Sequence, residues 1–435
     1  MAEARREALI VAYAFPPVGG AGVQRMSKLV KYLPLHGFTP RVLTVANPSV
    51  PLTDASLARD LPADLEVIRA RSLEPGYAAK KVAWEAAADV NPSRKKQALR
   101  FATGLVRQLA YPDIQMLWMP GAHAALARVL VQRPPAVVLI SGPPFSQFLL
   151  APLARARSAV VLDYRDEWSL IRGAYEMTRS TVARLVGDPL EAALLRTAHM
   201  VTTATEEFRQ NLLDRFTFLD PSAVVAIPNG YDLEDFPADL PSPPADRFVV
   251  SHVGTVFKLT SPAGLLGAIR RLHATEPELA RLLEVRFIGR IVDLEAAAFE
   301  GLEALGVKRI GYLDHDEAVR ALASSHLVLC ILDDTAGVER IYPAKIFELM
   351  AMKRPTLTLA PDGALSRLVE RHRIGDRLFP RDEAAICALL AAKLRAFRDG
   401  QPAAALTPID TAQFDRRAIA GAFADVMRTA IQRAR

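Results

Sequence analysis

The sequence predicts an α/β protein built from two doubly wound domains, each with a parallel sheet between layers of helices. Short apolar runs rich in β-branched residues recur along the chain, and segments with helical periodicity separate them. A proline-rich stretch divides this series in two. With 435 residues, 51% of them hydrophobic, the chain is long enough for two large packed domains, and its composition excludes disorder as the main state.

The first domain opens with an apolar run, residues 8–14, which reads as a buried strand because it is short and ends at two prolines. A glycine-rich loop (18–22), a helical segment (23–35) and a second strand (41–45) complete a βαβ unit. Its right-handed crossover puts the loop at the carboxyl edge of the sheet. Further strands are predicted at 136–141, 159–164, 200–204 and 223–227.

Residues 228–247 contain five prolines and are the predicted linker. The strands predicted beyond it are 248–253, 285–288, 309–312, 327–332 and 356–360, with helical segments that include 262–273 and 345–352. The predicted domains are 1–240, with a helical insertion at about 73–110, and 245–410, followed by a C-terminal helix over 411–435. Packing back on the first domain is one option for that helix.

Charge, cysteines and hydropathy narrow the function classes. Lys and Arg total 54 against 48 Asp and Glu, and an anionic substrate or a phospholipid surface explains the net charge of +6 as well as nucleic acid does. The two cysteines cannot form a disulfide framework and fit a reducing compartment. The start lacks a secretion signal, and no stretch reaches the roughly 18 apolar residues of a membrane span. We therefore expect a cytoplasmic protein with no nucleic-acid partner.

Several predicted strand-end loops carry glycine or polar motifs, and ligands of open α/β sheets bind beyond these ends. Gly19 and Gly20 let backbone N–H groups approach an anion at the start of a helix, although a tight turn explains the cluster equally well. The Asn-Gly pair at 229–230 reads most simply as a turn. Asp333 and Asp334 could hold a divalent ion, but solvation is the commoner role, and the eight histidines lack metal-ligand spacing. We predict no metal site.

The most informative segment is 342–355. Pro343 suits the first turn of a helix, and the free amides after it can receive a phosphate. Glu348 lies on a helix that is otherwise apolar, and a buried carboxylate there needs a partner such as a ribose diol. The alternative is a surface ion pair of Glu348 with Lys345 or Lys353, worth less than about 1 kcal/mol.

A second polar loop follows the strand that ends at residue 164. Asp163, Arg165 and Asp166 gather there beside Trp168. Asp166 could act as a base or orient a sugar hydroxyl; equally, Asp163 and Arg165 could pair to hold the loop. The rigid loop 141–146 lies on the same edge and is suited to shaping a pocket.

Together these motifs resemble the family-4 retaining glycosyltransferases. The matching segments are FPPVGGAGVQR, IPNGYD, SHVGTVFK and YPAKIFELMAMKRPTL, in an order that spans roughly residues 1–375. DYRDEW and SGPPFS also resemble the bacterial members that build surface polysaccharides and modified glycans. The resemblance implies the GT-B architecture, with two Rossmann-like domains facing each other across a cleft. It also implies sugar transfer from a nucleoside-diphosphate sugar to a hydroxyl acceptor with retention of anomeric configuration.

The resemblance further implies a role for each matching position. The implied catalytic residues are Asp166, Lys258 and Glu348. The implied donor contacts are Gly19, Gly20 and Asn229; Lys258 on the diphosphate, with Arg290 or Lys345 as helper; Ile310 and Gly311 on the base; the backbone around Tyr342, Pro343, Ala344 and Lys345 on the phosphates; and Glu348 on the ribose. The implied acceptor contacts are Phe145, Arg165, Asp166 and Trp168.

Two positions depart from the family pattern. The family has a glutamate eight positions before the second one, where this chain has Arg340, and Glu339 lies one residue off. Thr255 stands near the place where an arginine is common. No carboxylate is clearly placed as a nucleophile, so front-face attack is expected, with the leaving phosphate taking the proton. We expect no cofactor and no obligatory metal.

The expected acceptor is a glycan or a lipid-linked molecule. Residues 71–107 are basic and partly apolar, so they could rest on anionic lipid as a peripheral contact or form a solvated charged face. The alternative function is a non-catalytic GT-B-fold subunit or sugar-nucleotide-binding protein. Arg340 favours it, whereas Glu348, Lys258 and the glycine loop favour an enzyme. No motif supports a GT-B sugar epimerase.

Overall fold

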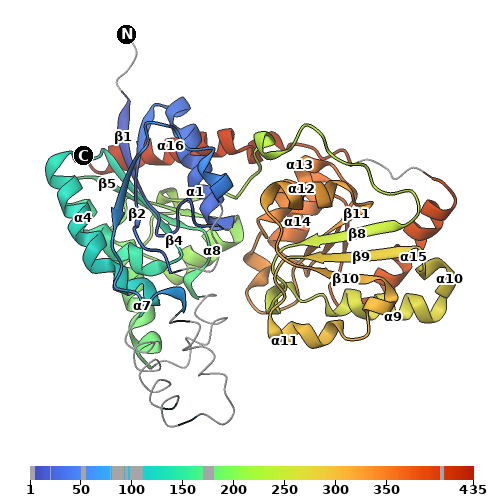
Figure 1. The fold of residues 1–435 in the computed structure, drawn as a ribbon. Coiled ribbons are helices and arrows are strands. Elements are labelled where there is room, and N and C mark those ends of the chain that lie inside the picture. The colour runs from blue at the N-terminus through green and yellow to red at the C-terminus, as the bar shows by residue number, and fades with distance from the viewer. Residues whose placement is uncertain are drawn as a thin grey trace. The chain divides into compact units, whose positions relative to one another are not determined.

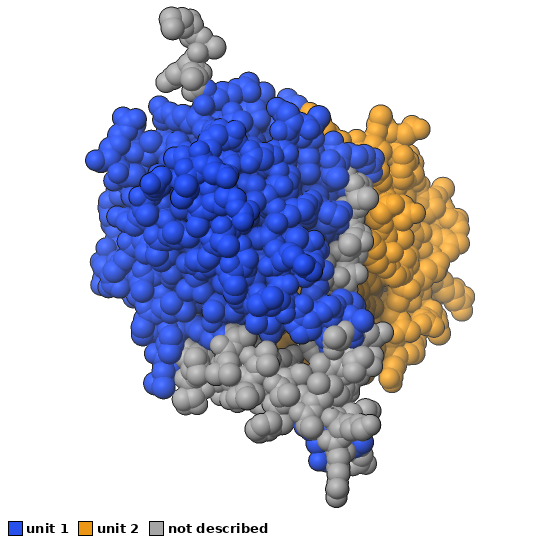
Figure 2. All heavy atoms as spheres, turned by 60° about the vertical axis from the view of Figure 1, so that its left-hand side comes forward, with its two compact units in different colours: residues 1–228, 416–435 blue, residues 229–415 orange. Residues whose placement is uncertain are grey.

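The computed structural model describes residues 5–19, 21–49, 55–78, 80, 93, 97, 111–169, 181–401 and 406–435. The chain divides into two compact units, coloured separately in Figure 2. Unit 1 comprises Met1–Pro228 and Arg416–Arg435, and unit 2 comprises Asn229–Asp415. The boundary therefore falls directly after Pro228, the first residue of the predicted linker, and residues 229–247 belong to unit 2.

Unit 1 contains a seven-stranded parallel sheet (Figure 1). Its strands are β1 (Arg6–Val11), β2 (Phe38–Val45), β3 (Glu66–Ala70), β4 (Val137–Gly142), β5 (Ala159–Tyr164), β6 (Met200–Thr203) and β7 (Val224–Ala226). They are arranged in the order β3-β2-β1-β4-β5-β6-β7. This is a doubly wound order, and it reverses between β1 and β4, the position at which such sheets bind ligands.

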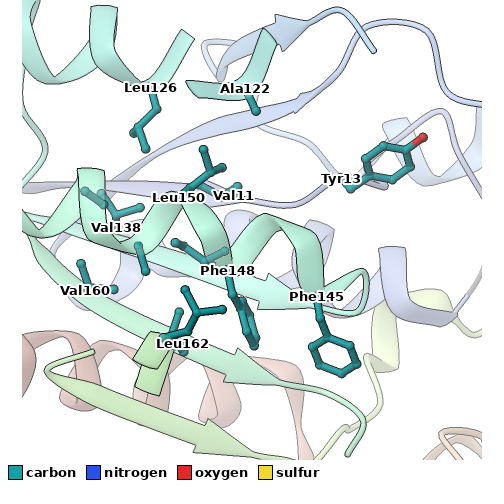
Figure 3. Close-up of a cluster of buried hydrophobic side chains, with 14 of the residues drawn as sticks. Val11, Tyr13, Ala122, Leu126, Val138, Phe145, Phe148, Leu150, Val160 and Leu162 are labelled. Atoms are coloured by element: carbon teal, nitrogen blue, oxygen red, sulfur yellow. The ribbon is translucent and has the colours of Figure 1, made fainter. Parts of the chain in front are cut away.

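Helices cover both faces of this sheet. They are α1 (Ala21–Tyr32), α4 (Met119–Gln132), α5 (Ala151–Arg155), α7 (Thr181–Leu195), α8 (Glu206–Arg215) and α16 (Arg416–Arg433), with the 3-10 turns η1 (Leu33–His36), η2 (Ala55–Ala58), η3 (Ile114–Trp118), η4 (Phe145–Leu150) and η6 (Pro221–Ala223). Ala8 and Ile10 of β1 belong to the core formed with α1 and α16. Leu9 and Val11 belong to the opposite core, formed with α4 and η4 (Figure 3). The alternation follows from the two-residue period of a strand.

Unit 2 repeats the plan with a six-stranded parallel sheet. Its strands are β8 (Phe248–Val253), β9 (Leu283–Ile288), β10 (Val307–Ile310), β11 (Leu327–Ile331), β12 (Thr356–Leu359) and β13 (Asp376–Leu378), in the order β10-β9-β8-β11-β12-β13. Its helices are α9 (Ala263–Thr275), α10 (Pro277–Ala280), α11 (Asp293–Ala296), α12 (His315–Ala323), α13 (Lys345–Met352), α14 (Ala364–His372) and α15 (Glu383–Arg398). Its 3-10 turns are η7 (Leu233–Asp235), η8 (Lys258–Thr260), η9 (Ala297–Phe299), η10 (Glu303–Leu305), η11 (Val338–Arg340) and η12 (Ala412–Phe414).

The C-terminal helix belongs to unit 1 although it follows unit 2 in sequence. α16 begins at Arg416 and packs beside α1, as Figure 1 shows. Most of the predicted insertion at 73–110 lies outside the described residues. Among the described helices the longest is α16, with 18 residues, and none combines the length and hydropathy needed to cross a bilayer.

A buried ion pair ties α1 to the sheet of unit 1. Arg25 is 2% exposed, and its Nη2 donates to Oδ1 of Asp163 over 3.1 Å. Asp163 is fully buried and also accepts from Ser141 Oγ (2.6 Å) and Thr202 Oγ1 (2.8 Å), so it joins three neighbouring strands. Burial alone would raise the pKa of Asp163, but the charge and hydrogen bond of Arg25 outweigh it and lower the pKa. Arg25, and not Arg165, is therefore the partner that holds this loop.

Candidate functional site

The glycines at the carboxyl edge of the unit 2 sheet let three strand ends pair closely. Gly254 and Gly289 have φ of 151° and 125°, a region that favours glycine. Their amides donate to Ile288 O and Ile310 O, both over 2.9 Å. A Cβ on Gly289 would lie 2.5 Å from the carbonyl oxygen of Gly254, so only glycine fits there without a shift.

Four of the donor contacts that the family resemblance implies lie at or just after the ends of β8, β9 and β10. Lys258 begins η8, and Arg290 accepts at its carbonyl from Val256 N over 2.8 Å. The Lys258 and Arg290 side chains are exposed. Ile310 ends β10, and Gly311 follows it with an exposed backbone. The sheet thus brings two exposed cations and an accessible glycine backbone to one edge.

Helix α13 holds the candidate carboxylate. It begins at Lys345, as predicted, so Pro343 lies two residues before the helix and not in its first turn. Its neighbours Ile346, Phe347, Leu349 and Met350 are buried. Glu348 is only 14% exposed at its side chain, and its Oε2 accepts from Lys345 Nζ over 2.9 Å. Of the two cations weighed for Glu348, Lys345 is therefore a partner, in a pair far less exposed than a surface ion pair.

Arg340, where the chain departs from the family pattern, pairs with Glu339 in the loop before α13. Arg340 Nη1 pairs with the carboxylate of Glu339, whose other oxygen accepts from Gly337 N over 2.9 Å. The backbone of Glu339 packs tightly against Gly363, where a Cβ would lie 2.6 Å from the Glu339 carbonyl oxygen. Glu339 is thus engaged by its own loop and by its arginine neighbour.

Asp333 also has a cationic partner. Its two carboxylate oxygens accept from Nε and Nη2 of Arg381 over 3.2 and 3.1 Å. Arg381 is thus the partner of the Asp333 carboxylate in this loop. Across the part of the chain that the structure describes, no three His, Cys, Asp or Glu side chains gather as metal ligands.

His252 lies near the end of β8 and is 6% exposed. Its Nδ1 lies 3.4 Å from Leu329 O on β11, its ring packs against Phe287, and its Nε2 is buried without a hydrogen-bond partner. Burial, aided by the nearby charge of Lys345, lowers the pKa of His252 from 6.5 to about 4.

This depressed pKa predicts an acid-sensitive fold. Below pH 6.5 an unfolded His252 takes up a proton while the folded one resists it, so the free energy of unfolding falls as the pH drops from about 6.5 towards 4. The full effect is on the order of 3 kcal/mol. His199 and His326, whose pKa values burial also lowers, add to it. Urea unfolding at pH 7.5, 6 and 5 should show this fall in the free energy of unfolding. In His252→Phe the free energy should fall less steeply with pH, and an equally steep fall would contradict the assignment of the depressed pKa to His252.

In unit 1 the glycine loop makes room for an arginine. A Cβ on Gly22 would overlap the guanidinium of Arg165, and Arg165 Nη2 donates to Pro143 O. Arg165 therefore reaches back to the start of α1, while the next residue, Asp166, is exposed. Gly19 is half-buried, and Gly20 lies outside the described residues.

The prediction that Phe145 and Trp168 contact an acceptor is not supported. They are 3% and 1% exposed, and their rings stack in the core with centroids 4.8 Å apart (Figure 3 shows Phe145). The amides of Phe145 and Ser146 donate to Asp113 Oδ2 over 2.6 and 3.0 Å. Because core packing occupies both rings, neither ring is exposed to an acceptor.

The segment from Asn229 to Asp232 has structural contacts of its own. Tyr231 is buried, and its amide donates to Phe414 O over 2.9 Å. Asp232 Oδ1 accepts from Glu234 N over 3.1 Å at the start of η7. Asn229, half-buried, is the first residue of unit 2.

Comparisons with known proteins agree with this architecture. Residues 19–230 match the model of the glycosyl transferase 4-like domain. Similar solved structures include sucrose-phosphate synthase from Thermosynechococcus elongatus, with 15% identity, a TM-score of 0.59, and coverage of 98% of this chain and 94% of that one. HepE from Anabaena, in complex with UDP and glucose, has 15% identity, a TM-score of 0.56 and 98% coverage of each chain. A glycosyltransferase from Rickettsia africae has 14% identity, a TM-score of 0.56, and coverage of 98% and 99%.

At these identities the likeness to solved structures establishes the fold alone. The predicted class, two doubly wound Rossmann-like domains of the GT-B type, is confirmed. No curated protein sequence matches the chain closely enough to count as a relative.

Proposed function

Because residues 19–230 form a glycosyl transferase 4-like domain in a chain with the GT-B fold, we propose that the protein transfers a sugar from a nucleoside-diphosphate sugar to a hydroxyl acceptor, with retention of anomeric configuration. The family match supports glycosyl transfer as the general activity. The donor class, the stereochemistry and the residues below are our proposal.

One observation carries the donor assignment. Glu348 is a nearly buried carboxylate in the first turn of α13, where the positive end of the helix dipole and Lys345 lie beside it. A ribose diol can donate two hydrogen bonds to such a carboxylate. The helix N-terminus and Lys345 can at the same time face a diphosphate. A single short helix thus offers groups that match both parts of a nucleotide.

The proposed chemistry is displacement of a nucleoside diphosphate. The bond between the anomeric carbon and the phosphate oxygen breaks, and the acceptor oxygen bonds to the same face of that carbon. The acceptor proton moves to the leaving phosphate. Lys258 and Arg290 are exposed cations at the same sheet edge as α13 and would stabilise the charge of the leaving group. We propose that these protein cations suffice, without an obligatory metal or a cofactor.

Unit 1 would bind the acceptor. Asp166 is exposed beside Arg165, so this pair offers an acid or base and a cation to a hydroxyl-bearing acceptor. We propose a glycan or lipid-linked acceptor in cell-surface polysaccharide or glycoconjugate synthesis, at the cytoplasmic face of a membrane. Liposome flotation with and without acidic lipid tests the membrane contact, and equal flotation would count against it.

The second candidate is a sugar-nucleotide-binding protein without catalysis. The observation that favours it is the Arg340–Glu339 pair, which occupies the region where the family has its first glutamate.

A panel of nucleotide sugars separates the two candidates. The protein is incubated with UDP-glucose, GDP-mannose, ADP-glucose and dTDP-glucose, and binding and nucleotide release are measured. Our proposal predicts that one donor binds and slowly releases its nucleoside diphosphate. Binding of a donor without release of its nucleoside diphosphate, with or without an added acceptor, would favour the second candidate. The absence of any donor binding would contradict both.

A further inference from the structure

The unpaired nitrogen of His252 lacks an explanation in the fold. Native proteins pair nearly all buried polar atoms, because an unpaired one costs folding free energy. His252 is buried, with only 6% of its surface exposed, and its Nε2 has no hydrogen-bond partner. A phenylalanine would fill the same space against Phe287 without that cost.

The other ring nitrogen determines which group Nε2 could bind. Nδ1 faces the carbonyl oxygen of Leu329 over 3.4 Å, and a carbonyl can only accept. The proton of the neutral ring therefore belongs on Nδ1, which leaves a lone pair on Nε2. The missing partner of Nε2 must be a hydrogen-bond donor.

The position of the ring links it to the candidate donor site. An ideal Cβ on Gly254 would lie 3.5 Å from Nε2, so Nε2 lies beside the backbone of Gly254. Gly254 opens the loop that leads to Lys258. The charge of Lys345 on α13 also acts on the ring. Nε2 thus lies close to both segments to which we assign the donor.

We infer that His252 is a donor-binding residue, whose Nε2 accepts a hydrogen bond from a hydroxyl group of the bound nucleotide sugar. This inference rests on the proposed function. The hydroxyl belongs to the ribose or to the transferred sugar, two sources with the same chemistry. No residue of the family resemblance fills this role, and its chemistry comes from the unpaired lone pair alone.

The test compares two histidines of unit 2 at pH 7.5. His252→Phe keeps the packing on Phe287 and removes the lone pair. His326→Phe is the matched control: His326 also stacks on a phenylalanine, Phe248, but its Nδ1 accepts from Val249 N over 3.0 Å. Calorimetry measures the affinity of each variant for the donor that the wild type binds best, and for the matching nucleoside diphosphate. Thermal unfolding gives each Tm.

His252→Phe should lower the affinity for the donor at least tenfold while its Tm stays equal or rises. His326→Phe should lower the Tm and keep the affinity within twofold. A loss already seen with the nucleoside diphosphate assigns the hydroxyl to the ribose, and a loss seen only with the nucleotide sugar assigns it to the sugar. The inference would be overturned, and the proposed function left standing, if His252→Phe bound the donor as tightly as the wild type. The same holds if its donor affinity fell only together with its Tm. A wild type that binds no donor would overturn the proposed function as well.

Discussion

Replacing Glu348 by alanine should weaken donor binding by about 30- to 1,000-fold. The variant removes a charged acceptor for two ribose hydroxyls, and hydrogen bonds to charged groups are worth roughly 1.5–3 kcal/mol each. It also frees Lys345, which Glu348 holds at 2.9 Å at the start of α13. The fold itself should lose little, because the side chain of Lys345 is 32% exposed and water can solvate its charge once Glu348 is removed. Calorimetric titration with the best donor of the panel measures the effect.

Two further variants make this result specific. Glu348→Gln keeps an acceptor oxygen and loses the charge, so its affinity should lie between those of the wild type and Glu348→Ala. Glu370→Ala removes an exposed carboxylate of α14 in the same unit and should leave the affinity unchanged. Donor affinity of Glu348→Ala equal to that of Glu370→Ala would remove Glu348 from the site.

Replacing Asp163 by alanine should destabilise unit 1 by about 3–5 kcal/mol. The change leaves the guanidinium of Arg25 buried without its carboxylate, the most costly way to break a buried ion pair. It also leaves the hydroxyls of Ser141 and Thr202 without the carboxylate that accepts their hydrogen bonds. All three tryptophans of the chain lie within residues 1–228, so tryptophan fluorescence during urea unfolding reports on unit 1.

The controls for this prediction are a double variant and a neighbour. Arg25→Met with Asp163→Leu replaces both charges by apolar groups and should recover much of the loss, because no buried charge is left unpaired. Arg165→Ala removes the arginine next in sequence, which is only half-buried, and should cost less than Asp163→Ala. Equal losses in Asp163→Ala and Arg165→Ala would show that Arg25 is not the main partner.

Hydrophobic periodicity was sufficient to predict most of the fold. The strands 159–164 and 248–253 and the helix 345–352 have the predicted bounds, because each is a compact apolar run with clear boundaries. β3 and β13 were missed. β3 reads Glu-Val-Ile-Arg-Ala and β13 has only three residues, so neither edge strand has the apolar run by which central strands are recognised.

The sequence was less informative about the candidate site, because partners distant in the chain decide it. Asp163 suggested Arg165, two residues away, but its partner is Arg25, 138 residues away. Arg25 follows the glycine loop on α1, where Ser27 and Lys28 are buried as well, and a cation on this largely buried helix was the available signal. The family resemblance implied Trp168 and Phe145 as acceptor contacts, whereas packing buries both. His252 gave no signal in the sequence, since only the structure reveals its unpaired nitrogen.

Hydrogen exchange measured by mass spectrometry, with and without a saturating nucleotide sugar, tests the central claim most directly. If unit 2 grips the leaving nucleotide, slowed exchange should concentrate in the backbone of residues 254–260 and 342–350, and Glu348→Ala should abolish it. Slowed exchange confined to other parts of the chain, or unaltered exchange with every sugar diphosphate of the panel, would contradict the account.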